Sequence, residues 1–199
     1  MIDELIEEKV ASTEYPVIDL IKNRWSPRAF SSEPIEHEKI MSMLEAARWA
    51  PSSFNEQPWN FIIFNKEDEE AFSKIMDILS PRNQRWAGNA PVIMLSVAKV
   101  NFERNGKSNK YSLHDVGGAV ANLTLQATSM GLYVHQMAGF DSEKAKKVFN
   151  IPEGYEPVTA IAVGYLGDKE DLPEEFYRSE SAPRNRKSVS DFTFEGKWS

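Results

Sequence analysis

Residues 113–130 read LHDVGGAVANLTLQATSM, which is the strongest helical pattern in the chain. The larger apolar side chains fall on one stripe at the helical period: Val116, Val120, Leu123, Ala127 and Met130. A second face is nearly bare, because it carries Gly117, Gly118, Ala119 and Ala121. Each glycine inside a helix costs about 1 kcal/mol relative to alanine. We therefore expect another element, such as a helix, to pack very close to this face.

Outward from this helix, the chain alternates between two kinds of pattern. Helices are expected at Pro16–Arg24, Ile35–Trp49, Asp68–Leu79, Leu113–Met130 and from a cap at Asp141 through Phe149. Strands are expected at Trp59–Asn65, Pro91–Ala98, Leu132–Phe140, Pro157–Leu166 and Ser190–Phe194. Pro91–Ala98 is almost continuously apolar, which is typical of a central strand buried on both faces. These patterns predict one domain over residues 1–199, an α/β or α+β sandwich with a sheet between helices.

Composition limits the class of protein and of partner. The 199 residues carry a net charge of −7 and contain no cysteine. An acidic chain is a poor ligand for a phosphate backbone, so nucleic acid is not an expected partner. The lack of cysteine excludes thiol nucleophiles, disulfides and cysteine-bound metals. The acidic start has no signal-peptide pattern and the apolar runs are too short to span a bilayer, so we expect a soluble, cytoplasmic protein and no membrane partner.

The common catalytic motifs are missing from the sequence. The histidines His37, His114 and His135 stand alone, without a second ligand at metal-binding spacing, so no metal site is expected. There is no G-x-G-x-x-G, no phosphate-binding loop and no G-x-S-x-G elbow. If the chain is an enzyme, its reactive group is expected to come from a cofactor.

Three segments carry unusual concentrations of polar groups. Arg24–Phe30 places two arginines and a serine in a turn stiffened by Pro27, which suits phosphate oxygens but also suits a helix C-terminus. Ala50–Trp59 is bounded by prolines, and its amides could bind the edge of a planar heterocycle or simply form a turn. Pro183–Lys187 is a basic cluster near the end of an acidic chain, where a solvated tail is the default.

In this order, the three segments resemble the FMN-dependent nitroreductase family. Further matching features are Asn83, the glycine-rich helix after His114-Asp115, residues His135–Asp141, and the strand Ile161–Tyr165 after Ile151–Gly154. The resemblance runs from about Val17 to Trp198. It implies an α+β fold with a mainly antiparallel sheet flanked by helices, in an intertwined homodimer with FMN tightly bound at both interface sites. The tail, residues 168–199, would complete the FMN site and the dimer.

Residue by residue, the resemblance implies the following FMN contacts. The phosphate would be held by Arg24, Ser26, Arg184 and Arg186, next to Trp25. Arg28 would lie near N1 and the C2 carbonyl of the flavin, and Asn83 at the pyrimidine edge. The ring would lie against Gln136, Met137, Ala138 and Gly139. The partner subunit would contribute Pro51, Ser52, Ser53, Asn55 and Gln57.

The resemblance also implies a substrate pocket formed by Phe54, Trp86, Phe102 and Tyr111. Trp86 stands where relatives have a second basic residue, so either Arg85 replaces that charge or Arg28 acts alone. Ala138 stands where some relatives have an acid. Lys99–Ser112 is expected to form a small, mobile lid, and Phe54 either forms the wall above the flavin or packs in the dimer core.

The implied activity is transfer of a hydride from NADH or NADPH to the flavin, and then reduction of an electron-poor small molecule such as a nitroaromatic, a quinone or a free flavin. No side chain is expected to be catalytic, since the flavin N5 performs the chemistry. Two alternatives stay open. The same scaffold could serve reductive dehalogenation, flavin breakdown or a dehydrogenation, or the chain could store or sense FMN without turnover.

Overall fold

The computed structural model describes residues 2–198 and is built around one four-stranded sheet. Its strands are β1 (Trp59–Asn65), β2 (Val92–Lys99), β3 (Tyr133–Met137) and β4 (Tyr155–Gly164). They lie in the order β1-β2-β4-β3, and each neighbouring pair is antiparallel. The four long predicted strands are therefore confirmed, and the antiparallel pairing makes the fold α+β.

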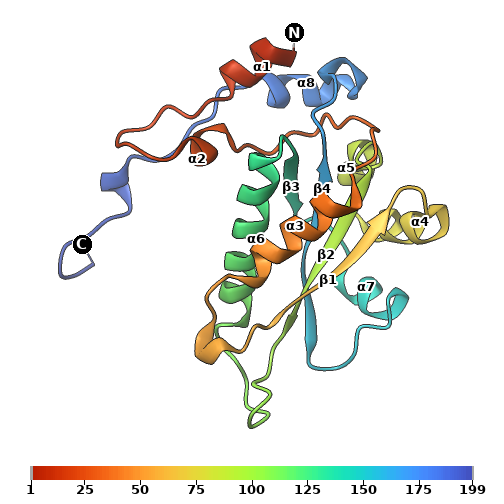
Figure 1. Cartoon of the computed structure of the whole chain (residues 1–199), viewed down its shortest axis with the longest axis vertical. Coiled ribbons are helices and arrows are strands. Elements are labelled where there is room, and N and C mark those ends of the chain that lie inside the picture. The colour runs from red at the N-terminus through yellow and green to blue at the C-terminus, as the bar shows by residue number, and fades with distance from the viewer. Residues whose placement is uncertain (1, 199) are drawn as a thin grey trace.

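Helices cover both faces of the sheet (Figure 1). On one face, α3 (His37–Arg48) and α6 (Ser112–Ser129) bury Met43, Val116 and Leu123 against Met94 and Ile161. On the other face lie α4 (Glu69–Ile78), α5 (Pro81–Ala87) and α7 (Ser142–Val148). Side chains of β2 alternate between the two cores, so the prediction of a central strand buried on both faces is confirmed. Within residues 2–198, no helix is both long and apolar enough to cross a membrane.

The structure contains short helices that the periodicity does not predict: α1 (Ile2–Glu8), α5 and α8 (Glu174–Ser181). Each has seven or eight residues, too few turns for an apolar stripe to repeat. The predicted helix Pro16–Arg24 is shorter than expected, because Ile18 is still extended and α2 covers only Asp19–Asn23. Three further single turns are 3₁₀ helices: η1 (Ser53–Asn55), η2 (Lys169–Asp171) and η3 (Val189–Asp191).

The predicted strand Ser190–Phe194 is wrong. This segment begins in η3, where the Ser188 and Asp191 side chains cap each other's backbone, and it pairs with no strand in the described part of the chain. Phe192 and Phe194 alternate as a strand would require, yet both side chains are exposed. Alternation alone does not make a strand, because the backbone groups also need a neighbouring edge.

Before it projects from the body, the tail packs against the N-terminal segment (Figure 1). Arg184 Nη1 donates to the carbonyl oxygens of Lys9 and Lys22, at 2.8 and 2.6 Å. In return, Lys9 Nζ donates to the Ala182 carbonyl oxygen. These reciprocal bonds bring the two ends of the chain together beside α8.

Candidate functional site

Arg24, Ser26, Arg184 and Arg186 lie around one cavity of about 210 Å³, which we call the basic cavity. The rest of its wall is formed by Lys9, Trp25, Ser179, Glu180, Ala182 and Pro183. The structure thus brings together both basic segments that the sequence singled out, although about 160 residues of chain separate them.

The wall of the basic cavity contains more positively charged side chains than negatively charged ones. Burial lowers the pKa of Arg24, and the neighbouring Arg186 lowers it further. Arg24 Nη1 donates to Ser26 Oγ at 3.2 Å. Glu180 is the carboxylate of the wall, and its Oε1 accepts from the backbone N–H groups of Arg28 and Ala29. Several positive charges lie close together here, and the bonds described above do not use all of their N–H donors. Such a site suits a dianionic group such as a phosphate monoester.

Lys9 is a member of the basic cavity that the sequence did not suggest. Its side chain is 3% exposed, and Nζ lies 5.1 Å from the centre of the Trp25 ring. Burial lowers its pKa, an effect that the Glu180 carboxylate opposes. A single lysine in an acidic helical segment carries no signal of its own, and only the fold places it beside the tail.

From the basic cavity, residues 24–28 contact the side chains of Tyr133 and His135 in β3. Trp25 packs edge-on against Tyr133 at a ring separation of 6.0 Å, and His135 Nδ1–H donates to the Pro27 carbonyl oxygen at 2.8 Å. Burial lowers the pKa of His135 to about 4. Because β3 is the last strand of the sheet, its outer backbone groups are available to a ligand, and Gln136 and Ala138 are exposed there.

At the end of β3, Gly139 makes a close contact that excludes a side chain. A Cβ at this position would lie 2.7 Å from Ser80 Oγ and 2.9 Å from Asn83 Nδ2. Asn83 Nδ2 instead donates to the Gly139 carbonyl oxygen at 3.0 Å. This bond fixes the Asn83 amide and leaves its Oδ1 to accept from a ligand. Met137 is buried, so its contribution to a ligand would come from the backbone.

The surroundings of Arg28 contradict the expected place of Trp86 and one of the two alternatives for the second charge. Trp86 is 1% exposed and stacks on Phe30, so it is a core residue and does not line a substrate pocket here. Arg85 is bound to Glu175 of α8 at 2.6 Å and does not supply the second charge near Arg28.

Arg82, which the sequence analysis missed, takes that position. The guanidinium groups of Arg28 and Arg82 both lie on the Phe176 ring, at 5.7 and 5.8 Å. Burial lowers the pKa of Arg28, Glu180 opposes this, and the charge of Arg82 lowers it further. Ser80-Pro81 follows the end of α4. It is also an N-cap followed by proline at the first helical position, a signal that would have predicted α5 and its Arg82.

The loop Pro51–Gln57 does not join this group of residues. It lies at the opposite end of the molecule from the basic cavity, beside the hairpin that follows β2 (Figure 1). Phe54, Asn55 and Gln57 have φ of 54°, 56° and 51°, a left-handed backbone that is costly for residues other than glycine. The buried carboxylate of Asp115 on α6 holds the loop by accepting from the Ser53 N–H at 3.0 Å.

Three side chains form a cluster at this end, which we call the Phe54 cluster. The Phe54 ring packs edge-on against Phe102 at 5.9 Å, and the Arg104 guanidinium lies 4.0 Å from the Phe54 ring centre and 5.2 Å from that of Phe102. Phe54 is 71% exposed, and Tyr111 nearby is exposed as well. The segment predicted to form a lid contains a hairpin, with an Asn101–Ser108 bridge and a bond from the Phe102 N–H to the Lys107 carbonyl oxygen.

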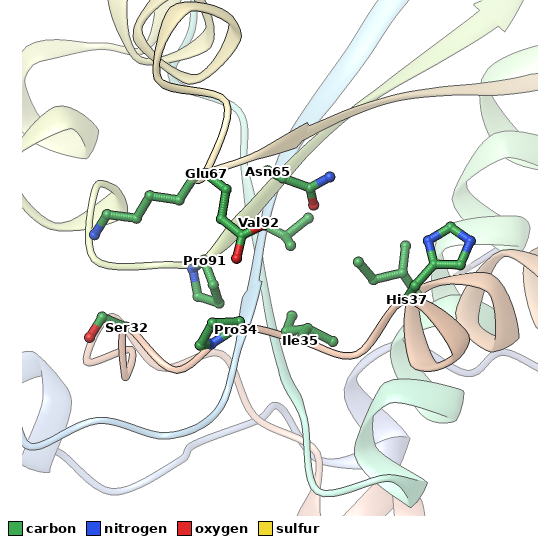
Figure 2. A pocket seen from close by; sticks show the side chains of 10 residues that line it. Ser32, Pro34, Ile35, His37, Asn65, Glu67, Pro91 and Val92 are labelled. Carbon is green, nitrogen blue, oxygen red and sulfur yellow. The ribbon is translucent and has the colours of Figure 1, made fainter.

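A second cavity, of about 520 Å³, lies elsewhere and is lined by none of the predicted site residues. It opens between the segment before α3 and the start of β2, and Pro34, Ile35, Pro91 and Val92 form much of its wall (Figure 2). In Figure 2 the His37 imidazole stands apart from the Glu67 carboxylate. Polar groups that do not converge make a poor small-molecule site, so this cavity is not the candidate. Residues 2–198 also contain no cluster of potential metal ligands.

Comparison with known proteins identifies the fold and the family. The sequence profile of the Nitroreductase family matches residues 21–165, which is most of the chain. The chain belongs to the nitroreductase family. The basic-cavity residues Lys9, Arg184 and Arg186 lie outside the matched range, so they belong to the parts of this nitroreductase-family chain that the profile does not describe.

Individual relatives agree with this assignment. A crystal structure described as an oxidoreductase containing FMN matches with a TM-score of 0.90 and 34% identity, over 96% of this chain and 97% of that one. An uncharacterized 15.4 kDa protein of Mycolicibacterium smegmatis is 32% identical over 130 residues, 65% of this chain and 86% of its own length. The FMN reductase (NAD(P)H) of Bacillus subtilis is 26% identical over 180 residues, 80% of this chain and 71% of its own.

Proposed function

We propose that this nitroreductase-family chain is an FMN-dependent NAD(P)H oxidoreductase. The observation that carries the proposal is the basic cavity, where Arg24, Ser26 and Arg186 surround a space suited to a phosphate group. A relative of nearly the same length, 34% identical, is described as an oxidoreductase containing FMN. When bound, FMN supplies the redox chemistry by accepting two electrons from NAD(P)H and donating them to a second substrate.

The residues of this chain would bind and orient the cofactor. Arg24 and Arg186 would donate charge-assisted hydrogen bonds to the phosphate, with the buried Lys9 adding positive charge. The open edge of β3 would face the ring through backbone groups, and Asn83 Oδ1 would accept from a ring N–H. Arg28 would place a positive charge near the ring edge that becomes negative on reduction. Ala138 offers no acid there, so we assign no side chain a catalytic role.

A second copy of the chain would complete the site. The Pro51–Gln57 loop lies at the other end of the molecule from α8 and the N-terminal segment, which flank the basic cavity, so we infer that it serves the cofactor site of a second copy (Figure 1). Helix α6 supports a homodimer, because a Cβ at Gly117 or Gly118 would meet no other atom within 4 Å. This apolar face, continued by the exposed Leu113, is open for close approach of a second backbone.

The acceptor we propose is a small electron-poor molecule such as a nitroaromatic, a quinone or a free flavin. The exposed aromatic rings of Phe54 and Tyr111 offer stacking surfaces for flat molecules. The sequence has no dinucleotide-binding fingerprint, which agrees with a nicotinamide donor that binds briefly in the same open cleft.

Spectroscopy of the purified protein tests the proposal. We expect the visible spectrum of bound FMN, its bleaching by NADH or NADPH under anaerobic conditions, and its return when a quinone or nitroaromatic is added. Protein that binds FMN but is not bleached by either nucleotide would be a flavin store. Bleaching without turnover of these acceptors would favour a different reaction, to be sought among halogenated substrates. Protein that does not bind FMN would contradict the proposal.

A further inference from the structure

The Phe54 cluster combines a flat aromatic surface with an unpaired positive charge. Arg104 lies against the faces of Phe54 and Phe102, at 4.0 and 5.2 Å from the ring centres. Among the side chains that the structure describes, those of residues 5–198, its guanidinium has no ion-pair or hydrogen-bond partner. Stacking restricts the side chain without using its N–H groups, so these donors remain available to an anion.

The neighbouring acids are already engaged. Glu103 forms an ion pair with Lys99 at 3.3 Å. Glu56 accepts a hydrogen bond from the Glu103 N–H, which ties the Pro51–Gln57 loop to the hairpin that carries Arg104. Among the described side chains, neither Glu103 nor Glu56 forms an ion pair with Arg104.

The cluster is also held in place. Three of the seven residues in the Pro51–Gln57 loop have positive φ, and the loop is bonded to the buried Asp115 at one end and to the hairpin at the other. This backbone is strained, is hydrogen-bonded to other elements at both ends and presents an exposed phenyl ring. Such a loop is more typical of a binding surface than of a connecting turn.

We propose that Arg104 and Phe54 recognise a planar ligand that carries a negative charge: the ring stacks on Phe54 and the anion pairs with the Arg104 guanidinium. This inference rests on the proposed function, in which the loop lies beside the flavin of the second copy. Two ligands share the chemistry. An aromatic acceptor with a carboxylate is one, and a nicotinamide donor with the additional phosphate of NADPH is the other.

Steady-state kinetics of the FMN-loaded enzyme tests the inference with ligands that differ in charge. We would measure kcat and KM for 4-nitrobenzoate and for the neutral 4-nitrobenzamide, and separately for NADPH and NADH. The variants are Arg104→Gln, Arg104→Lys and a matched control, Lys107→Gln, which removes a positive charge from the same hairpin outside the cluster. Binding of 4-nitrobenzoate to the oxidised enzyme, followed by the change in the flavin spectrum, gives a second readout that does not depend on turnover.

In Arg104→Gln we expect the KM and the dissociation constant for one of the two anionic ligands to rise about tenfold, the value of one charge-assisted contact. The values for the neutral counterpart and kcat should change by less than about twofold, and Arg104→Lys should restore part of the affinity. A rise for 4-nitrobenzoate identifies the acceptor as the anionic ligand, and a rise for NADPH identifies the donor.

Equal changes for charged and neutral ligands, or the same effect in Lys107→Gln, would overturn the inference. A wild-type enzyme that reduces both acceptors without any dependence on Arg104 would overturn this inference alone. A wild-type protein that neither binds FMN nor oxidises NAD(P)H would instead overturn the proposed function.

Discussion

Arg184 and Arg186 stand two residues apart in the tail, yet the structure gives them different roles. Arg184 is committed to the carbonyl oxygens of Lys9 and Lys22, whereas the Arg186 side chain is exposed and bonds only to the neighbouring Asn185 carbonyl oxygen. Arg186 is therefore the residue whose loss reports on ligand binding, since Arg184→Ala would also release the tail.

Replacing Arg186 by alanine should weaken FMN binding by about 1.5–3 kcal/mol, the contribution of a hydrogen bond to a charged group. Riboflavin has no phosphate, so its affinity should be almost unchanged. Fluorescence titration of apoprotein with each flavin measures both constants. Arg48→Ala is the matched control, because Arg48 is exposed on α3 and pairs only with Glu45. Equal losses for FMN and riboflavin would mean that Arg186 does not contact the phosphate.

His135 makes the stability of the fold depend on pH. Its folded-state pKa is about 4, below the ordinary value of 6.5, because the ring is buried against Trp86. As pH falls below 6.5 the unfolded chain binds a proton that the folded chain does not, so stability is lost between pH 6.5 and about 4. The loss should be at most about 3 kcal/mol.

Urea unfolding of wild type and His135→Gln between pH 7.5 and 4.5 measures this effect. Glutamine can still donate to the Pro27 carbonyl oxygen but does not titrate, so the stability of the variant should fall less steeply with pH. Identical slopes for the two proteins would show that His135 is not the titrating group.

At the scale of the element, α6 is a helix with two adjacent glycines in its interior, and its surroundings bear on why they are there. The face that carries Val116, Val120 and Leu123 is buried in the core of the chain, as the sequence pattern predicts. Around Gly117 and Gly118 a Cβ would meet nothing within 4 Å, so packing within one chain does not require glycine there. We propose that glycine is required at these positions because a second chain packs closely against α6.

The variant Gly118→Leu distinguishes packing within one chain from packing between two chains. Within one chain a Cβ at this position meets no atom within 4 Å, and leucine has a helix propensity about 1 kcal/mol better than glycine. Against a second α6 it should overpack the interface by about 1–3 kcal/mol. We therefore expect a folded protein with normal helical content, a larger monomer fraction in sedimentation velocity and less bound FMN. Gly118→Ala is the control, and an unchanged dimer with full FMN occupancy in Gly118→Leu would place the interface elsewhere.

At the scale of the whole molecule, the N-terminal segment and α8, which flank the basic cavity, lie at the opposite end of the molecule from the Pro51–Gln57 loop, which carries Phe54 (Figure 1). If each FMN is held by the cavity of one copy and the loop of the other, two defective chains should complement each other. One chain would carry Arg24→Ala and Arg186→Ala. The other would carry Asn55→Val, since a β-branched residue disfavours the left-handed backbone at this position.

Refolding the two variants together should restore FMN binding in up to about a quarter of the sites, because half of the dimers are mixed and each mixed dimer holds one intact site. Flavin absorbance per chain, measured after dialysis, counts these sites. Each variant refolded alone is the control. If the mixture binds no more FMN than the two controls, both halves of the site must come from the same chain.

Several parts of this architecture were predictable because neighbouring residues carry the signal. The strand Trp59–Asn65 was predicted with its observed ends, and Asp68 and Asp141 cap α4 and α7 by accepting from the N–H groups of Ala71 and Lys144. Prediction from the sequence was wrong where the tertiary structure determines which residues are buried and which strands can pair. Trp86 occupies a position expected at the pocket but lies in the core, and Ser190–Phe194 alternates without a strand to pair with.

The sequence by itself determined which chemical groups this protein possesses, where its longer helices and strands lie, and its resemblance to a family whose membership the comparison confirms. These properties depend on side-chain type and on spacing of a few residues, which are local. Only the tertiary structure decided that Lys9 shares a cavity with Arg184, 175 residues later, that Arg82 rather than Arg85 stands beside Arg28, and that Arg104 lies on Phe54. Such contacts join distant parts of the chain, and their geometry is set by how the sheet and its two cores pack.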